Sequence, residues 1–321
     1  MGLKGKIPPE IQHLDRLEVL SLQFNPDLHG TLPVELSYMS DLKHLALQYN
    51  GFEGTIPKWI GEFTALKYLG LGNNMFTGPI PTSIVSLTNL EVLGLDDNGL
   101  SANIKLFAPL TKLKSLYLED NGIYGMLSDK LLESWPEMLE LDLSSNLLYG
   151  ELPSTLFMNE KSKLRVLDLH GNAIVGSIPK LIPHPNYNLE FLALHENRLS
   201  STVPASLTNL KKLRHLDISR NGFTSTLPDE LGEMTELQYL FTATNAFSQG
   251  RLPSFIEKLT NLRELGMKDN NLTGQLPGFI RYLTNLKLLD LRKSLSTMPH
   301  SLKYSCTYSS STCYSFPSLH S

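Results

Sequence analysis

The chain has 321 residues, of which 41% are hydrophobic, and it carries 28 Lys and Arg against 32 Asp and Glu, a formal net charge of −4. This balance provides no broad basic surface, which argues against binding of nucleic acid. No stretch reaches the roughly 18 consecutive apolar residues of a membrane span, so no transmembrane helix is predicted.

A unit of about two dozen residues recurs along most of the chain. It is clearest in residues 42–66, LKHLALQYNGFEGTIPKWIGEFTAL. Leu45 and Leu47 alternate with small or polar residues, which is the period of a short strand with one buried face. Parallel strands need a crossover, and residues 54–66 supply it. Because neighbouring strands lie about 4.8 Å apart, twelve units predict a parallel sheet roughly 55 Å long.

An asparagine follows the predicted strand in eleven successive units. Backbone groups that become buried at such a turn have no ladder partner, and a short amide side chain offers both a donor and an acceptor. We therefore interpret these asparagines as structural residues that line an internal ladder. Spaced 23 to 26 residues apart, they are Asn25, Asn50, Asn74, Asn98, Asn121, Asn146, Asn172, Asn197, Asn221, Asn245 and Asn270.

The first half of the unit, L-x-x-L-x-L-x-x-N, is the signature of a leucine-rich repeat. Its continuation in residues 54–57, GTIP, resembles the 24-residue plant-type subclass, known from ectodomains of receptor-like kinases and receptor-like proteins and from polygalacturonase inhibitors. The resemblance implies an α/β solenoid, right-handed by the crossover rule, with a parallel β-sheet on the concave face and short 3₁₀ or extended segments on the convex face. It also implies ligand recognition at the cell surface or outside the cell.

The N-terminal residues start in the middle of a unit. They lack the apolar core of a signal peptide, and aligning residues 5–14 with the repeat places Met1 on an asparagine position. A solenoid end needs a cap, and the paired cysteines of the plant-type cap are missing here. We expect a truncated N-terminus or a half-repeat acting as a cap; the alternative is a degenerate first turn. Exposure of Leu3, Ile7 and Ile11 would favour self-association through this end.

Several units in the middle of the chain depart from the pattern. Ala102 and Lys105 replace the usual Gly and Pro, which predicts a change of bend or twist. An insertion after this unit carries Trp135 on the convex side. Residues 157–163, FMNEKSK, lengthen a crossover and are expected to extend a helical turn, and residues 182–187, PHPNYN, form a proline-punctuated loop.

The last part of the chain contains one unusual core residue and a biased tail. Thr242 takes a core position usually held by Leu, which predicts looser packing or a hydroxyl bonded to the backbone. The repeats span residues 1–293, whereas residues 294–321 are rich in Ser and are predicted to be weakly ordered. The tail holds the only cysteines, Cys306 and Cys313. By family resemblance they could pair in a C-terminal cap, but the surrounding sequence does not match one.

The concave face is where we expect function, because its outward side chains are free of the core. The register sorts these side chains into an aromatic patch, an acidic patch and a patch of rings and imidazoles. Exposed aromatics are typical of binding hot spots, and clustered carboxylates suggest a cationic partner, with a solvated face as the alternative. The candidate ligand-binding residues are Phe24, Tyr49 and Tyr68; Asp96, Asp97, Glu119, Asp120, Glu140, Asp142 and Asp168; and His170, Phe191, His195, His215, Tyr239 and Phe241.

His170 and His195 occupy one column of adjacent strands and are expected within roughly 5 Å of each other. His215 lies one strand further and in another column, so the three or four converging ligands of a metal site are not supplied, and no cofactor is predicted. Two close imidazoles disfavour double protonation, so we hypothesise that ligand binding changes between pH 5 and 7. Asp168, His170 and Ser219 share the face, but no nucleophile turn or phosphate loop accompanies them.

The sequence thus predicts a non-catalytic, receptor-like recognition module that binds a protein or peptide ligand through its concave face. It predicts no nucleic-acid partner and no membrane insertion. The alternative is a free-standing intracellular scaffold or secreted inhibitor built on the same repeats. One glycosylation sequon, Asn271-Leu272-Thr273, is close to chance frequency and matters only for a secreted protein.

Overall fold

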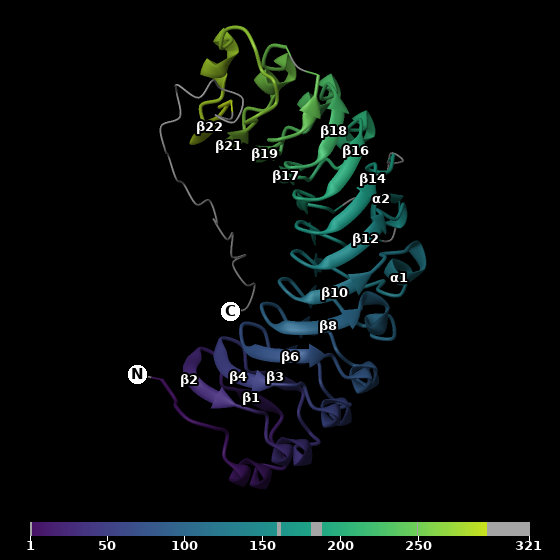
Figure 1. Ribbon diagram of the computed structural model, residues 1–321, viewed down its shortest axis with the longest axis vertical. Coiled ribbons are helices and arrows are strands. Elements are labelled where there is room, and N and C mark those ends of the chain that lie inside the picture. Colours follow the sequence, from purple (N-terminus) through teal and green to yellow (C-terminus); the bar gives the residue numbers. More distant parts are fainter. Residues whose placement is uncertain (1, 159–161, 181–187, 249, 294–321) are drawn as a thin grey trace, which may run out of the picture.

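The computed structural model describes residues 2–158, 162–180, 188–248 and 250–293. These residues form one right-handed solenoid that curves into an arc (Figure 1). Most coils consist of a strand on the inner side, a turn, a second strand on the flank and a short crossover on the outer side. The predicted loop at residues 182–187 and the predicted tail, with Cys306 and Cys313, lie outside the described residues.

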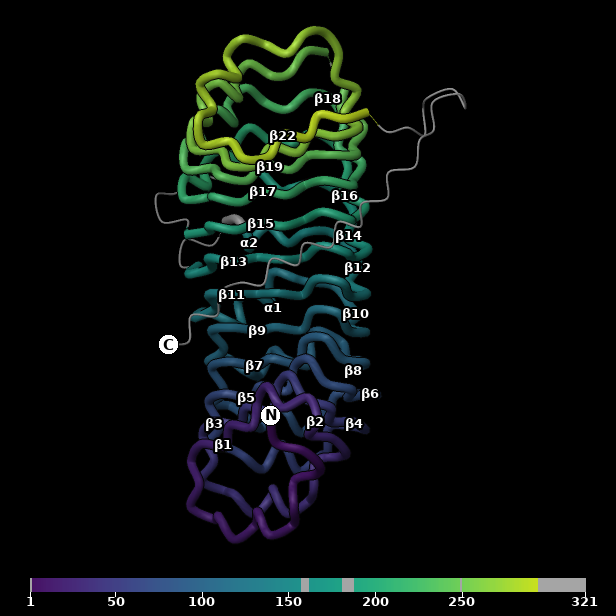
Figure 2. Tube along the Cα trace, turned by 90° about the vertical axis from the view of Figure 1, so that its left-hand side faces the viewer, coloured from purple at the N-terminus to yellow at the C-terminus, as the bar shows by residue number. Residues whose placement is uncertain are grey.

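The inner side of the arc is a 12-stranded parallel sheet, visible face-on in Figure 2. Leu45, Leu69, Leu93 and Leu116 are paired from strand to strand, which confirms the leucine row expected from the repeat. The strands are β1 (Val19–Ser21), β3 (His44–Ala46), β5 (Tyr68–Gly70), β7 (Val92–Gly94), β9 (Ser115–Tyr117), β11 (Glu140–Asp142), β13 (Val166–Asp168), β15 (Phe191–Ala193), β17 (His215–Asp217), β19 (Tyr239–Phe241), β21 (Glu264–Gly266) and β22 (Leu288–Asp290).

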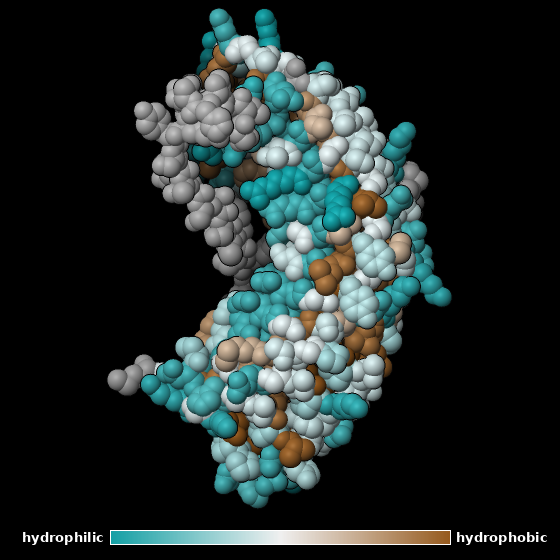
Figure 3. Space-filling view, viewed as in Figure 1, coloured by the Kyte–Doolittle hydropathy of each residue, from teal (hydrophilic) through white to brown (hydrophobic). Residues whose placement is uncertain are grey.

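A second parallel sheet of 10 strands covers one flank of the arc, and the sequence did not predict it. Each strand begins beside a ladder asparagine and buries few apolar side chains, such as Phe52, Phe76 or Leu100. Apolar residues gather on the outward face over the middle of this flank (Figure 3). The strands are β2 (Asn25–Gly30), β4 (Asn50–Gly54), β6 (Met75–Pro79), β8 (Gly99–Asn103), β10 (Gly122–Gly125), β12 (Leu147–Glu151), β14 (Ala173–Gly176), β16 (Arg198–Ser201), β18 (Gly222–Ser225) and β20 (Ala246–Phe247).

The outer side carries short helices, as predicted. Most are 3₁₀ helices preceded by an extended proline, such as Pro57 with φ −73° and ψ 151°. They are η1 (Pro9–His13), η2 (Val34–Tyr38), η3 (Lys58–Glu62), η4 (Thr82–Ser86), η5 (Ile104–Phe107), η6 (Ala205–Asn209), η7 (Asp229–Glu233), η8 (Ser254–Lys258) and η9 (Gly278–Tyr282). Two α-helical turns, α1 (Asp129–Glu133) and α2 (Thr155–Met158), interrupt the series. Where Ser128 replaces the proline, its side chain accepts a hydrogen bond from the Leu131 N–H and α1 begins.

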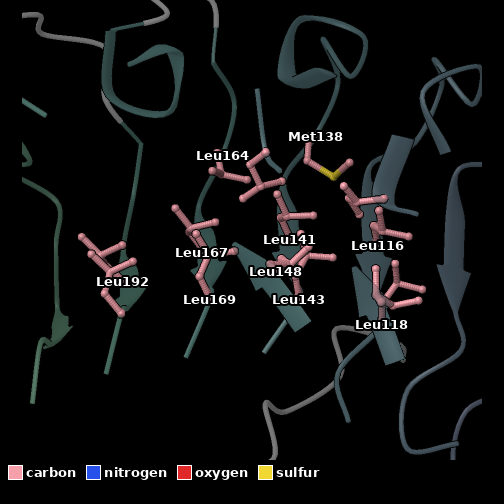
Figure 4. Packing of buried hydrophobic residues seen from close by; sticks show 14 of the residues in the cluster. Leu116, Leu118, Met138, Leu141, Leu143, Leu148, Leu164, Leu167, Leu169 and Leu192 are labelled. Atoms are coloured by element: carbon pink, nitrogen blue, oxygen red, sulfur yellow. The ribbon is translucent and has the colours of Figure 1, made fainter. Parts of the chain in front are cut away.

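The core is a continuous column of leucines between the two sheets and the outer helices. Figure 4 shows its middle section, where Leu116, Leu141 and Leu167 from neighbouring strands lie side by side and are fully buried. Trp135, expected on the outer side, is buried there, and its indole Nε1 donates to the Phe107 carbonyl at 3.2 Å. The core is thus shared by every coil, so each coil depends on its neighbours.

The ladder asparagines satisfy backbone groups at the turn between the two sheets. The amide nitrogen of Asn146 donates to the carbonyls of Leu118 and Ser144, both at 2.8 Å, and its oxygen accepts from the Ile123 N–H at 2.8 Å. At the C-terminal end of the ladder, the Asn270 amide instead donates to the Thr242 hydroxyl at 2.8 Å. Thr242 is fully buried, and its hydroxyl is bonded to this side chain, whereas the sequence predicted looser packing or a bond to the backbone.

The two ends of the described solenoid differ in how they are covered. The N-terminal half-repeat extends the second sheet, because the Leu3 N–H donates to the Asn25 side chain at 2.7 Å and Gly5 bridges to Leu28. Ile7 is therefore buried, and the expectation of an exposed Ile7 was wrong; Leu3 remains 55% exposed. On the last strand Leu289, whose equivalents in the preceding strands are buried, is 38% exposed.

Candidate ligand-binding face

The predicted aromatic patch is divided between two positions of the coil. Phe24 and Tyr49 lie in the turns that follow β1 and β3, where their rings stack with centroids 4.7 Å apart and are 63% and 46% exposed. Tyr68 begins β5 and stacks on His44 at 4.1 Å. The Gln48 amide, which donates to the Tyr68 hydroxyl at 3.0 Å, links the two positions. The exposed stack is the part that a ligand can reach directly.

Each turn before a ladder asparagine has a left-handed residue. Phe24 has φ 62°, Asp97 has φ 48° and Thr244 has φ 55°. Most side chains adopt this conformation only at a cost, and Asn, Asp and Gly adopt it most easily. The asparagine that follows each one anchors the turn, so the side chain of the left-handed residue is held at the border between the inner sheet and the flank.

The acidic patch consists of three layers with different access to solvent. Asp97 and Asp120 are exposed in the turns. Asp96 and Glu119, one residue earlier, are partly buried. Asp142 and Asp168, paired in register at the ends of β11 and β13, are only 4% and 6% exposed, so neighbouring side chains separate them from any ligand. The remaining member, Glu140, accepts a hydrogen bond from the Tyr117 hydroxyl.

Burial changes the ionisation of this row. It raises the pKa of Asp96 to about 6, with Asp142 adding repulsion. Burial and a hydrogen bond to Asp142 together raise the pKa of Glu119 to about 9. Glu119 is therefore protonated at neutral pH and donates to Asp142. The pKa of Asp142 is itself raised by burial and then by the charge of Asp168. The row thus carries less negative charge at pH 7 than its composition suggests.

The two histidines predicted to be neighbours form a stacked pair. The ring centroids of His170 and His195 are 4.2 Å apart and the planes differ by 6°. His170 Nδ1 lies 2.7 Å from Asp168 Oδ1, and His195 Nδ1 lies 3.4 Å from Asp217 Oδ2. Asp217 was missed in the sequence, although its register column contains Asp168 and could have revealed it.

His215 is part of the floor of the face. It is 9% exposed and stacks on Phe191 with centroids 4.2 Å apart, while Tyr239 and Phe241 lie at 5.6 and 5.7 Å. Burial lowers its pKa to about 4, so the ring is neutral at pH 7. The structure therefore brings together four of the predicted ring residues, Phe191, His215, Tyr239 and Phe241, as one packed cluster in which His215 supports its neighbours.

Within the residues that the structure describes, no group of three or more His, Cys, Asp or Glu side chains is arranged to hold a metal ion. No described helix has the length and apolar composition needed to cross a membrane. A cavity of about 30 Å³ lies between α1 and α2, lined among others by Leu132, Trp135 and Leu156. It is on the outer side and has room for about one water molecule.

Two family models, both described as leucine-rich repeat, match residues 40–100 and 187–247 and residues 163–184 and 261–283. The chain belongs to the leucine-rich repeat family. Receptor-like protein 41 of Arabidopsis thaliana is 30% identical over 169 residues, which are 52% of this chain and 16% of that protein. Receptor-like protein 9a of the same plant is 37% identical over 116 residues, 35% of this chain and 12% of that protein. The repeat protein thus spans a small part of these curated relatives.

Solved structures agree with the plant-type resemblance. The plant peptide hormone receptor RGFR1 in complex with RGF2 has a TM-score of 0.73 and 28% identity, covering 91% of this repeat protein and 53% of that chain. The ectodomain of the Arabidopsis receptor kinase HAESA, in complex with an N-terminally extended IDA peptide hormone, has a TM-score of 0.71 and 26% identity, covering 91% and 56%. A plant ice-binding protein has a TM-score of 0.66 and 27% identity, covering 77% and 80%. The likeness to the receptor ectodomains extends over about half of their length.

Proposed function

We propose that this leucine-rich repeat protein is a receptor-like recognition module that binds a peptide or protein ligand on its concave face. The observation that carries the proposal is the layout of that face: a 12-stranded sheet with rings and carboxyl groups held on a fixed frame. Its receptor neighbours, RGFR1 and HAESA, were solved with peptide hormones bound. A rigid face loses little conformational entropy of its own on binding, so the cost of ordering is confined to the peptide.

The chemistry of the face favours a ligand with basic side chains. Asp97 and Asp120 are exposed on adjacent coils and are backed by the partly buried Asp96. A guanidinium or ammonium group placed there gains charge-assisted hydrogen bonds and offsets the repulsion among the carboxylates. The exposed Phe24 and Tyr49 stack adds an aromatic contact of the kind found at binding hot spots. Because strands lie about 4.8 Å apart and an extended peptide rises about 3.3 Å per residue, roughly nine residues would cover six coils.

A peptide-display selection on the intact chain tests this function. We expect enrichment of basic peptides and, for a selected peptide, at least tenfold weaker binding to the Asp97→Asn, Asp120→Asn double variant. Asn is chosen because it tolerates the left-handed conformation of these positions, both at φ 48°, better than Lys would. Glu62→Gln, an exposed change on the outer helix η3, is the matched control and should leave affinity within twofold. The concave site would be refuted by selected peptides whose affinity is unchanged in the double variant and reduced in the Glu62→Gln variant.

A further inference from the structure

We propose that the stacked pair His170 and His195, flanked by Asp168 and Asp217, is a proton-operated switch that regulates ligand binding on the concave face. The regulation rests on the proposed function of that face. The switch is built from side chains of three adjacent coils, and it lies between the acidic patch and the ring cluster. A change of charge in the pair therefore alters the electrostatic potential at both the acidic patch and the ring cluster.

The geometry places one carboxylate beside each ring. Asp168 and Asp217 occupy the same register column two strands apart, with Ala193 between them. Ala193 itself is buried, and His195 lies alongside with 24% of its side chain exposed, against 29% for His170. Since the rings are parallel and 4.2 Å apart, two imidazolium ions would repel each other strongly. The pair therefore takes up one proton well before the second.

Charged groups around the pair come from every coil that packs against it. The β11 coil contributes Asp142, with Glu119 of the preceding coil beside it. The coil of the His195 ring contributes Glu196, whose carboxylate is paired with Arg220 of the next coil. From β17 come Asp217 and the neutral, buried His215. The surroundings are net acidic, which favours protonation of one ring of the pair. The charge on that ring still opposes protonation of the other ring.

The direction of each pKa identifies where the first proton goes. Burial opposes a charge on His170, but the hydrogen bond and charge of Asp168 outweigh it and raise the pKa of His170. At His195 burial prevails over the attraction of Asp217, and the neighbouring His170 helps to lower the pKa. The pair thus acquires its positive charge on His170 first. Asp96, whose pKa burial raises to about 6, loses its negative charge as the pH falls through that value.

Ligand affinity follows from these two changes. As the pH falls, the inner sheet gains a positive charge at His170 and, around pH 6, loses negative charge at Asp96. A basic ligand must then displace bound protons, and its affinity falls by up to about tenfold per pH unit for each proton displaced. An acidic ligand would bind more tightly over the same range. The switch therefore discriminates by the sign of the ligand charge.

Titration of the free protein tests the pair without any ligand. Histidine rings labelled with ¹³C are followed by NMR from pH 4.5 to 8.5 in the intact chain, with a histidine model peptide as the reference. We expect the midpoint of His170 above that of the model peptide and the midpoint of His195 below it. In the His195→Phe variant, which keeps a ring in the stack but removes its proton, His170 should titrate as a single site. Coincident midpoints for both rings, or protonation of His195 first, would overturn the switch.

A binding measurement with a hexa-arginine peptide, at constant ionic strength, tests the regulation. We expect at least tenfold weaker binding at pH 5.5 than at pH 7.5, and a smaller difference in the His170→Gln variant. Failure of the peptide to bind at either pH refutes the proposed cation-binding function, while the NMR midpoints still judge the pair. Equal binding at both pH values leaves the function standing and refutes the regulation.

Discussion

Replacing Asn146 by Ala is expected to destabilise the solenoid strongly. Asn146 is 6% exposed and makes short hydrogen bonds to the backbone of Leu118, Ile123 and Ser144, all at 2.8 Å. Each such bond contributes about 1 kcal/mol net, and a buried group left without its partner costs about 1 to 3 kcal/mol. Removing three bonds at once should therefore cost about 3 to 5 kcal/mol. That is a large share of the roughly 5 to 15 kcal/mol that stabilises an ordinary domain.

Urea unfolding followed by circular dichroism measures this loss. Asn146→Asp is a useful companion, because it keeps an acceptor for the Ile123 N–H but turns a second oxygen toward two carbonyls, so it should be at least as harmful. Asn89→Ala is the matched control: Asn89 is exposed on the outer side and its amide donates to the Thr64 carbonyl at 2.9 Å. This change should cost less than about 1 kcal/mol. Equal losses at the two positions would show that the ladder does not hold the coils together.

Three further changes test other features of the fold. Thr244→Gly should stabilise the protein by about 1 kcal/mol in urea unfolding, because a β-branched residue at φ 55° is strained and Gly is not. Burial lowers the pKa of His215 to about 4 in the folded protein, against about 6.5 in the unfolded chain. The contribution of the neutral ring to stability is therefore complete above pH 6.5, and up to about 3 kcal/mol of it is lost as pH falls toward 4. His215→Phe should flatten this pH dependence in unfolding measurements at pH 7 and 4.5. Burial and the hydrogen bond to Asp142 raise the pKa of Glu119, so its contribution to stability is lost as pH rises; Glu119→Gln should increase the free energy of unfolding at pH 8 and leave it unchanged at pH 4.

The inner sheet could be predicted from the sequence because leucine spacing fixes its register. The alternation around Leu45 places one face in the core, and the recurrence of the unit places equivalent residues on adjacent strands. The stacking of His170 on His195 followed from that register alone. The outer 3₁₀ turns were expected from the family resemblance, and the replacement of proline by Ser128 coincides with a change to an α-helical turn.

The second sheet and the depth of the site could not be predicted in the same way. Strands such as β8 bury few apolar residues, so their alternation of buried and exposed residues is too short to be recognised in the sequence. Their hydrogen-bonded pairing forms because the coils are already stacked. Asp142 and His215 were assigned to an accessible face from their register, but register does not say how far neighbouring side chains cover a residue. Both are nearly inaccessible to solvent, and only packed side chains could have shown it.

The flanking sheet has a consequence for how such an array can change in length. From β1 to β20 each coil is joined to the next by the same two sheets, so excising residues 75–98 would remove one entire layer and let β4 meet β8 and β5 meet β9. Duplication of a layer would likewise leave no strand without a neighbour. The array can therefore lengthen or shorten by whole coils. Each step would add or delete one row of side chains on the inner face and so change the ligand-binding surface, while the fold is retained.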